Sequence, residues 1–285
     1  MKFLILTVNS TLHSICELSR SLNNYNLEHQ IMDPFKFNQD EVMNTSYDCI
    51  LNRVSGISYN DQDLKFLENY SKRWPKTLII NDPIQTRVFR DKYKQFELYK
   101  ASSIPTIESL NLENTSVKHI EEFTKAHTSL KYLLKPLRSN QARGIQITEI
   151  PVNNFKKLQE LKDTKYILQP LILKKYEWRV LLIDNQILGV LKKETSNDDE
   201  LLNCEVATLT EVSQSDTPKE LRELVSKVII ASKLYIQALD ILEDHQGNYL
   251  LIEVNNVPGL KYFEKTTGIS PAKKLTQRII SNLRS

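Results

Sequence analysis

The first third of the chain alternates between short apolar runs and segments in which apolar residues recur every three or four positions. Short apolar runs at 2–6, 47–54 and 77–82 have the length of buried strands. The segments 12–22 and 63–74 between them repeat apolar residues every three or four positions, as helices do. Strands that alternate with helices are typical of a parallel sheet covered on both faces. We therefore expect a doubly wound N-terminal α/β domain over residues 1–85.

The middle of the chain changes to a mixed pattern. A charged stretch at 87–102 predicts one helix, which the Ile104–Pro105 step closes. From 116 onward the pattern predicts, in order, a helix at 117–127, a strand at 131–137, a polar loop at 138–144, a strand at 145–150, a helix at 155–163 and a strand at 165–172. We expect a compact α+β subdomain over residues 86–168.

The last third predicts a second α+β subdomain, over residues 169–285. Residues 176–195 read as two strands around a turn at Asp184 and Asn185. A long amphipathic helix at 218–235 leads into an apolar strand at 236–242, a turn at 243–248 and a further strand. A helix over 271–283 ends the pattern.

Composition narrows the class of protein. The 285 residues are 40% hydrophobic and 26% charged, and no apolar run approaches the length of a membrane span. A net charge of +3, with acidic and basic residues interspersed, gives no reason to expect nucleic acid as a partner. Cys16, Cys49 and Cys204 lack the spacing of a zinc site or a disulfide framework, so we expect buried, reduced thiols in a cytoplasmic protein.

Acidic and amide side chains interrupt two apolar strands near the C-terminus. Strand alternation places Leu251, Glu253 and Asn255 on one face. If Glu243 pairs with Asn248 across the intervening turn, the lone acid Asp240 falls opposite Leu251, one diagonal step from Glu253.

A single acid near a strand end is usually solvated. Burial of several uncompensated carboxylates on adjacent apolar strands is costly, however, and a cation between them removes the cost. Carboxylate and amide oxygens suit Mg²⁺. Asp240, Glu253 and Asn255 are therefore the candidate metal ligands.

Several motifs, taken together and in order, resemble the ATP-grasp superfamily and within it the RimK-type glutamate ligases. They are RDKYKQFEL at 90–98, YLLKPL at 132–137, YILQPLI and EWR within 166–179, LDIL at 239–242, IEVNNVPGL at 252–260 and EKTTGIS at 264–270. The resemblance implies an ATP-grasp fold in which ATP lies between the two α+β subdomains, behind the N-terminal α/β domain. It also implies an ATP- and Mg²⁺-dependent ligase, with Mn²⁺ as an alternative ion, that joins a carboxylate to an amine through an acyl phosphate.

The resemblance also implies roles for individual residues. Lys92 and Lys135 take the places of the cations that touch ATP, and Asp240, Glu253 and Asn255 those of the magnesium ligands. Arg179 corresponds to the arginine that stabilises the transferred phosphate, and Lys193 stands where the family has a second arginine. The remaining ATP-binding positions are Gly144 in the phosphate loop, Glu177, and Gln169, Pro170, Leu171 and Ile172 at the hinge that reads adenine.

The implied substrates are an amino acid, with glutamate the leading candidate, or another carboxylate, and an amine acceptor on a peptide, protein or metabolite. Family members are often homo-oligomers, and no membrane partner is expected. The loop at 138–144 keeps only one glycine, and proline stands at 170. These departures leave open a catalytically inactive ATP-binding regulatory or scaffold module. An α/β binding domain that takes no nucleotide is a third possibility.

Overall fold

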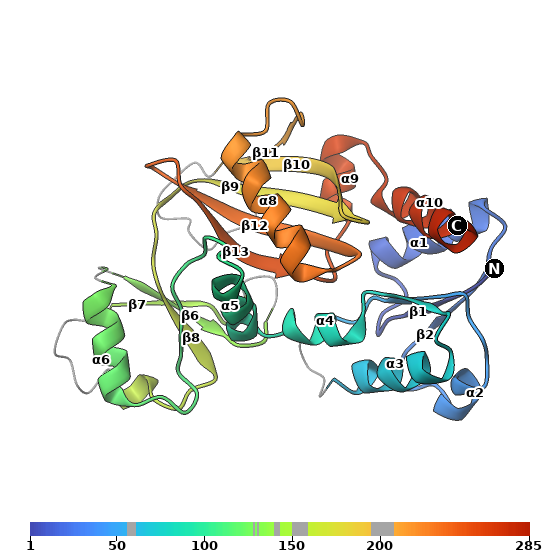
Figure 1. The fold of residues 1–285 in the computed structure, drawn as a ribbon, viewed down its shortest axis with the longest axis horizontal. Coiled ribbons are helices and arrows are strands. Elements are labelled where there is room, and N and C mark those ends of the chain that lie inside the picture. Colours follow the sequence, from blue (N-terminus) through green and yellow to red (C-terminus); the bar gives the residue numbers. More distant parts are fainter. Residues whose placement is uncertain (56–60, 128, 130, 140–142, 150–158, 195–207) are drawn as a thin grey trace.

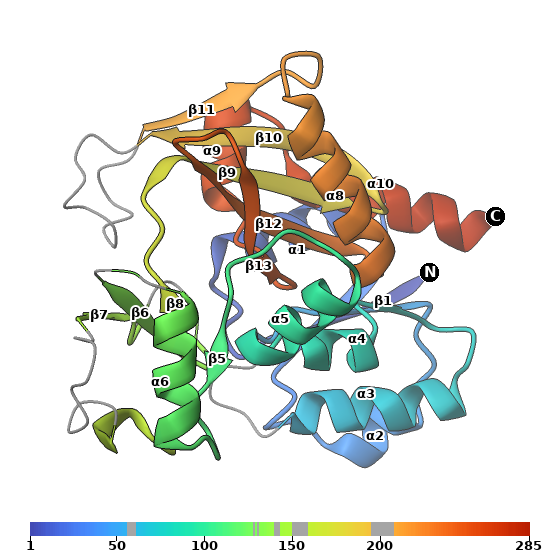
Figure 2. The ribbon, with the colours of Figure 1, turned by 60° about the vertical axis from the view of Figure 1, so that its left-hand side comes forward.

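The computed structural model contains three sheets that follow one another along the chain (Figures 1 and 2). It describes residues 1–55, 61–127, 129, 131–139, 143–149, 159–194 and 208–285. Most of the predicted helix at 155–163 and the acidic loop after residue 194 lie outside this described part of the chain. None of the described helices is both long and apolar enough to cross a membrane.

The N-terminal sheet is parallel, as predicted. Its strands, in the order β2-β1-β3-β4, are β1 (Lys2–Leu6), β2 (Glu28–Met32), β3 (Cys49–Asn52) and β4 (Leu78–Ile80). The connecting helices are α1 (His13–Asn24), α2 (Gln39–Met43) and α3 (Gln62–Arg73). Both faces of the sheet are apolar, and each contributes to its own buried cluster. This arrangement confirms the doubly wound α/β prediction.

The middle sheet is antiparallel and small. Its order is β5-β8-β6-β7, with β5 (Leu110–Asn111), β6 (Tyr132–Pro136), β7 (Gln146–Thr148) and β8 (Tyr166–Pro170). Helix α6 (Val117–Ala126) covers one face through Ile120, which is buried with Tyr132 and Leu168.

The C-terminal sheet has the order β11-β10-β9-β12-β13. Its strands are β9 (Lys174–Ile183), β10 (Gln186–Glu194), β11 (Thr208–Val212), β12 (Ile236–Asp244) and β13 (Tyr249–Asn255). Asp184 and Asn185 both adopt positive φ between β9 and β10, which confirms the predicted turn. Helices α8 (Lys219–Ser232), α9 (Lys261–Thr267) and α10 (Pro271–Arg284) complete this part.

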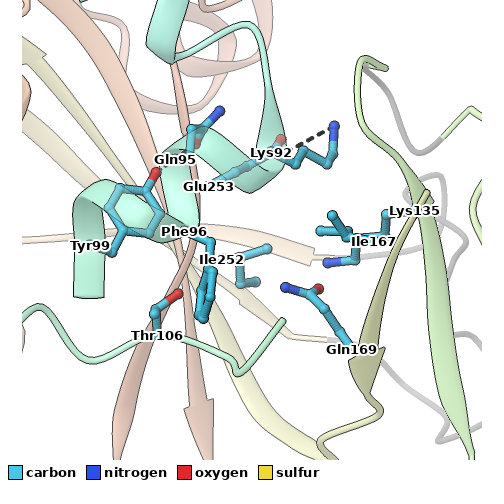
Figure 3. Close-up of a pocket in the computed structure, with 10 residues that line it drawn as sticks. All are labelled: Lys92, Gln95, Phe96, Tyr99, Thr106, Lys135, Ile167, Gln169, Ile252 and Glu253. Atoms are coloured by element: carbon cyan, nitrogen blue, oxygen red, sulfur yellow. Dashed lines mark hydrogen bonds and ion pairs between the residues drawn. The ribbon is translucent and has the colours of Figure 1, made fainter. Parts of the chain in front are cut away.

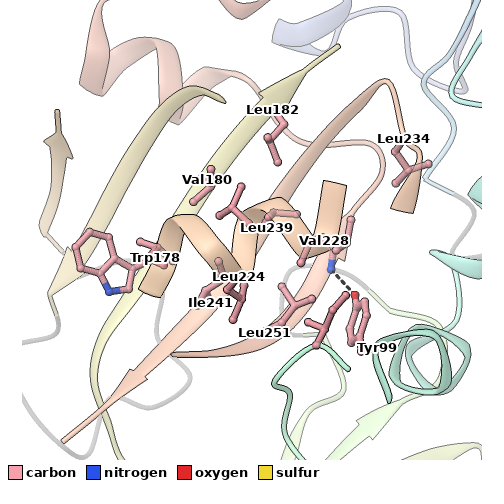
Figure 4. Packing of buried hydrophobic residues seen from close by; sticks show 14 of the residues in the cluster. Tyr99, Trp178, Val180, Leu182, Leu224, Val228, Leu234, Leu239, Ile241 and Leu251 are labelled. Atoms are coloured by element: carbon pink, nitrogen blue, oxygen red, sulfur yellow. Dashed lines mark hydrogen bonds between the residues drawn. The ribbon is translucent and has the colours of Figure 1, made fainter. Parts of the chain in front are cut away.

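The largest apolar cluster lies between the C-terminal sheet and two helices (Figure 4). Leu239, Ile241 and Leu251 of the sheet are fully buried there, against Val228 of α8 and Tyr99 of α5 (Lys92–Ala101). Because α5 packs on this sheet and also borders the middle sheet, it joins the two.

The C-terminal helix returns to the N-terminal domain. Leu275 and Ile279 of α10 are buried in one cluster with Ile15 and Leu18 of α1. The domain limits at 85 and 168 stay predictions, and α5 and α10 both pack against neighbours that lie beyond those limits.

Two local predictions were wrong. The single helix expected at 87–102 is interrupted between α4 (Pro83–Val88) and α5, because the Asp91 carboxylate accepts the N–H groups of Tyr93 and Lys94 and starts a new helix. Cys16 is exposed, since it lies one position beyond the buried stripe of α1, whereas Cys49 is buried as expected. Cys204 falls outside the described residues.

Candidate active site

The β12–β13 hairpin starts its pairing one residue away from the predicted register. Glu243 pairs with Tyr249 rather than with Asn248. The Asp244 carboxylate accepts the backbone N–H of Asn248 at 2.9 Å, and Gly247 adopts a φ of +83° beside it. Asn248 is thereby held in the turn, and the predicted pair between Glu243 and Asn248 is wrong.

A β-bulge at Ile252 then brings two carboxylates opposite each other. Asp240 pairs directly with Glu253, whereas Leu251 was predicted there. Because the bulge sets two residues of β13 against one of β12, the alternation of faces restarts after it. Leu251 and Val254 are buried in the same core cluster, so the predicted face shared by Leu251 and Glu253 is wrong. Asp240 and Glu253 lie together on the face away from that cluster.

Arg179 completes a row of charges across three strands. Asp240 lies between Glu253 on β13 and Arg179 on β9 in the sheet register. The Nη1 of Arg179 donates to Oδ1 of Asp240 at 3.1 Å. The pKa of Asp240 is raised to about 7, chiefly by burial and also by the nearby Glu253, against the opposing effect of Arg179. Two carboxylates so close together favour an additional cation between them.

Asn255 provides the third predicted metal ligand. It pairs with Ala238, two positions along β13 from Glu253, and so shares the face of the two carboxylates. Its Oδ1 accepts the backbone N–H of Val257 at 3.0 Å, which leaves a second lone pair on the amide oxygen. Two carboxylates and an amide oxygen fit Mg²⁺ by donor chemistry. Within the ranges the structure describes, there is no cluster of three or more His, Cys, Asp or Glu residues that could hold a metal.

Glu177 lies among cations on the same face of the sheet. Its Oε2 is 2.9 Å from Nζ of Lys174 and 3.4 Å from Nζ of Lys193. Burial raises the pKa of Glu177, but Lys174 and then Lys193 lower it by more, so the net shift is downward. The group is thus an ionised carboxylate at neutral pH, and it aligns both lysine side chains.

Lys92 and Lys135 face each other across a pocket between α5, β13 and the middle sheet (Figure 3). Nζ of Lys92 donates to the backbone oxygen of Ser139 at 2.7 Å and lies 3.8 Å from Oε2 of Glu253. Lys135 projects from β6 and is buried. Burial lowers its pKa to about 8, and Glu253 opposes that shift. A buried ammonium group at the wall of a pocket is suited to bind an anion.

The structure places the loop and hinge positions that were predicted to bind ATP around the pocket and at the end of β8. Gly144 has a φ of +75°, and a Cβ there would lie 3.0 Å from Pro136, so a larger residue would be strained. Gln169 lines the pocket and donates to Oγ of Ser109 at 2.6 Å. Pro170 ends β8, and the N–H of Leu171 donates to the oxygen of Lys131. Ile172 lies between β8 and β9, in the connection of the two subdomains.

Sequence reasoning missed part of the pocket wall. Gln95, Phe96 and Tyr99 of α5 also line it, together with Thr106. Oε1 of Gln95 and the hydroxyl of Tyr99 both approach the N–H of Val254, at 2.9 and 3.1 Å, and so tie α5 to β13. A signal was present, because positions 92, 95, 96 and 99 share one face of a helix.

Comparison with known proteins shows which family the chain belongs to. Residues 73–279 match the model of the RimK-like ATP-grasp domain. The "Probable alpha-L-glutamate ligase" of Haemophilus influenzae is 25% identical over 306 aligned positions, which cover 99% of this chain and 98% of that protein. The "Coenzyme gamma-F420-2:alpha-L-glutamate ligase" of Methanococcus maripaludis is 26% identical over 231 positions, which cover 80% of this chain and 69% of that protein.

Solved structures show the same fold. The ATP-grasp ligase PsnB, complexed with minimal precursor, Mg and ADP, superposes with a TM-score of 0.72 at 15% identity, over 99% of this chain and 98% of that one. The three sheets described above therefore have the ATP-grasp fold. Because the family model covers more than half of the chain and the curated relatives are named as ligases, the protein belongs to the RimK-like ATP-grasp family and is a ligase that forms carbon–nitrogen bonds.

Proposed function

We propose that the protein uses ATP and Mg²⁺ to join a carboxylate to an amine through an acyl phosphate. In this proposal an amino acid, with glutamate as the first candidate, supplies the amine, whereas the sequence resemblance made it the carboxylate substrate. The observation that carries the proposal is the charge row in which Asp240 lies between Arg179 and Glu253, beside a pocket that Lys92 and Lys135 line. Carboxylates for a metal and cations for phosphates thus meet at one place. The names of the two curated relatives support glutamate.

In this proposal the side chains divide the task by charge. Asp240, Glu253 and Asn255 hold Mg²⁺, which when bound neutralises phosphate charge. Lys135 and Lys92 bind phosphate oxygens from the middle-sheet side and the α5 side, and Gly144 allows the loop backbone to turn beside them. Gln169, Pro170, Leu171 and Ile172 border the adenine, and Glu177 orients Lys193.

The reaction needs positioning more than covalent help from the protein. The substrate carboxylate oxygen takes the γ-phosphoryl group and ADP leaves. The amine then attacks the acyl carbon, phosphate leaves, and the amine loses a proton. The fork of donors on Arg179 is suited to stabilise the negative charge on the phosphoryl oxygens.

The direct test measures ADP release by the purified protein with ATP, Mg²⁺, L-glutamate and candidate acceptors ending in a carboxylate. ADP release is expected only when both organic substrates are present, and hydroxylamine is expected to trap the activated carboxylate as a hydroxamate. ATP binding with no hydroxamate for any carboxylate would contradict ligation and favour the inactive regulatory module.

ATP affinity is expected to depend on pH through Lys135. Its pKa of about 8 without ligand means that the charged form is present below pH 8 and is lost as the pH rises through that value. Because phosphate binds the charged form, the Kd for ATP should rise by about tenfold from pH 7 to pH 9. Calorimetric titration would measure it. The Lys135→Met variant should bind more weakly at both values, with a much smaller change between them. Equal wild-type affinity at pH 7 and pH 9 would contradict the role of Lys135.

A further inference from the structure

Two arginines are buried at the carboxyl edge of the N-terminal sheet, and they differ in what surrounds them. Arg90 makes ion pairs with Asp63 and Asp61 at 2.5 and 3.1 Å, and it also donates to the oxygen of Val54. Its charge is matched by carboxylates of the protein itself. Its Nε has no hydrogen-bond partner among the described residues, but a buried guanidinium whose charge is matched by carboxylates is an ordinary structural feature.

Arg53 lacks this compensation. It follows β3, is 6% exposed, and its Nη2 donates to the backbone oxygen of Pro258 at 2.6 Å. Its Nε and Nη1 have no hydrogen-bond partner among the described residues. Burial lowers the pKa of Arg53 to about 10, and among the described residues no carboxylate opposes the shift. A neutral donor could satisfy the oxygen of Pro258, so this contact alone does not explain a buried charge.

A second unused donor lies on the segment that Arg53 contacts. Asn256, two residues before Pro258, is also 6% exposed, and its Nδ2 has no partner in the described part of the chain. The backbone oxygen of Asn256 accepts from Asn81, at the end of β4, at 2.9 Å. Unpaired donors without a matching acceptor indicate a missing anion rather than a missing cation.

The place of Arg53 in the fold is one where α/β proteins bind ligands. The chain turns from β1 to β2 on one side and from β3 to β4 on the other, so the direction of winding changes between β1 and β3. Arg53 lies at that point, since its N–H donates to the oxygen of Leu6 at the end of β1. Arg53 also contacts Pro258, in the segment that follows β13. Strand β13 carries Glu253 and Asn255.

We propose that Arg53, with Asn256, binds the α-carboxylate of the amino acid whose amine attacks in the ligation. The proposal rests on the proposed function. When an amino acid reacts through its amine, its own α-carboxylate takes no part in bond formation and needs a cation in the site. Arg53 supplies a positive charge and free N–H donors for that group, next to the segment that follows β13. The site thereby selects amino acids over simple amines.

The test compares L-glutamate with γ-aminobutyrate, the same molecule without its α-carboxylate, in the ADP-release assay. The wild type should use glutamate far better. In the Arg53→Met variant the kcat/KM for glutamate should fall by about 30-fold or more, and the preference over γ-aminobutyrate should disappear, while the Kd for ATP stays unchanged. The exposed Arg20→Met, in the same domain, is the matched control and should behave as wild type. If another amino acid is the better substrate, it is compared with its own decarboxylated amine.

The melting temperature of the Arg53→Met variant distinguishes a loss of stability from a loss of substrate binding. Replacement of a buried charge that has no counter-charge by an apolar side chain of similar length offsets the loss of the hydrogen bond to Pro258, so the melting temperature should stay close to that of the wild type. A variant that melts early, or one that keeps the wild-type preference for glutamate, would overturn the proposal. If the wild type releases no ADP, the proposed ligase function is wrong. The role of Arg53 can then still be tested by amino-acid binding. Each of the twenty amino acids is then tested singly for thermal stabilisation of the wild type and of Arg53→Met. Stabilisation of the wild type alone would support the proposed role of Arg53, and stabilisation of neither protein would refute it.

Discussion

Glu253→Gln is expected to lower turnover by at least about 100-fold at millimolar Mg²⁺, because it removes one of the two carboxylates that we propose as metal ligands without changing the size of the side chain. Asp240 and Glu253 lie opposite each other and repel when both are ionised. The substitution relieves this repulsion, so the free protein should melt at the wild-type temperature or slightly above it. Steady-state ADP release and thermal melting with and without MgATP would measure both effects.

The control for this substitution is Glu211→Gln, an identical change at an exposed position on β11 of the same sheet. It should leave both rate and melting temperature unchanged. Higher Mg²⁺ or Mn²⁺ should restore part of the rate of the Glu253→Gln variant, since weakened ligation is overcome by mass action. Undiminished turnover would remove Glu253 from the metal site.

Local sequence predicted which strands carry the site but not how their residues pair. Apolar runs bounded by turn residues located β12 and β13, and side-chain alternation brought the acids to one face. The true pairing depends on Asp244, which captures Asn248 in the turn, and on the bulge at Ile252. A bulge reflects a balance between core packing and strand pairing over the whole sheet, and no local pattern records that balance.

The two buried arginines also show that local sequence does not predict long-range contacts. Nothing near Arg53 or Arg90 in the sequence indicates that one is paired and the other is not. Their contacts come from Asp63 and from Pro258, which lies some 200 residues away. By contrast, the start of α5 could have been predicted, because aspartate at position 91 before a helical pattern is a common helix cap.

The charge row also explains why Arg179 should matter more for rate than for binding. The side chain of Arg179 is 35% exposed, and its guanidinium is held on one side by Asp240, whose side chain is 13% exposed. It is thus held in place yet can still reach a ligand. A cation whose bonds strengthen as charge develops on transferred phosphoryl oxygens lowers the barrier without tightening ground-state binding.

Arg179→Met is therefore expected to lower kcat by about 1,000-fold or more, with the Kd for ATP nearly unchanged. The Arg179→Lys variant keeps the charge but loses the fork of donors, so its kcat should lie between those of Arg179→Met and the wild type. Single-turnover formation of the hydroxamate, measured beside ATP titrations, separates the two quantities.

A second explanation for such a loss must be separated from the first, because Arg179 also contacts Asp240. Arg179 lowers the pKa of that carboxyl, which is nevertheless raised to about 7, chiefly by burial. Removal of Arg179 would raise the pKa further and leave this proposed metal ligand protonated at neutral pH. If this were the cause, the rate of the variant would return as the pH rises to about 9 or as Mg²⁺ is raised to saturation, because either favours the ionised carboxylate. A loss that persists under both conditions places Arg179 on the transferred phosphate, and recovery would reassign it as a positioning residue for Asp240.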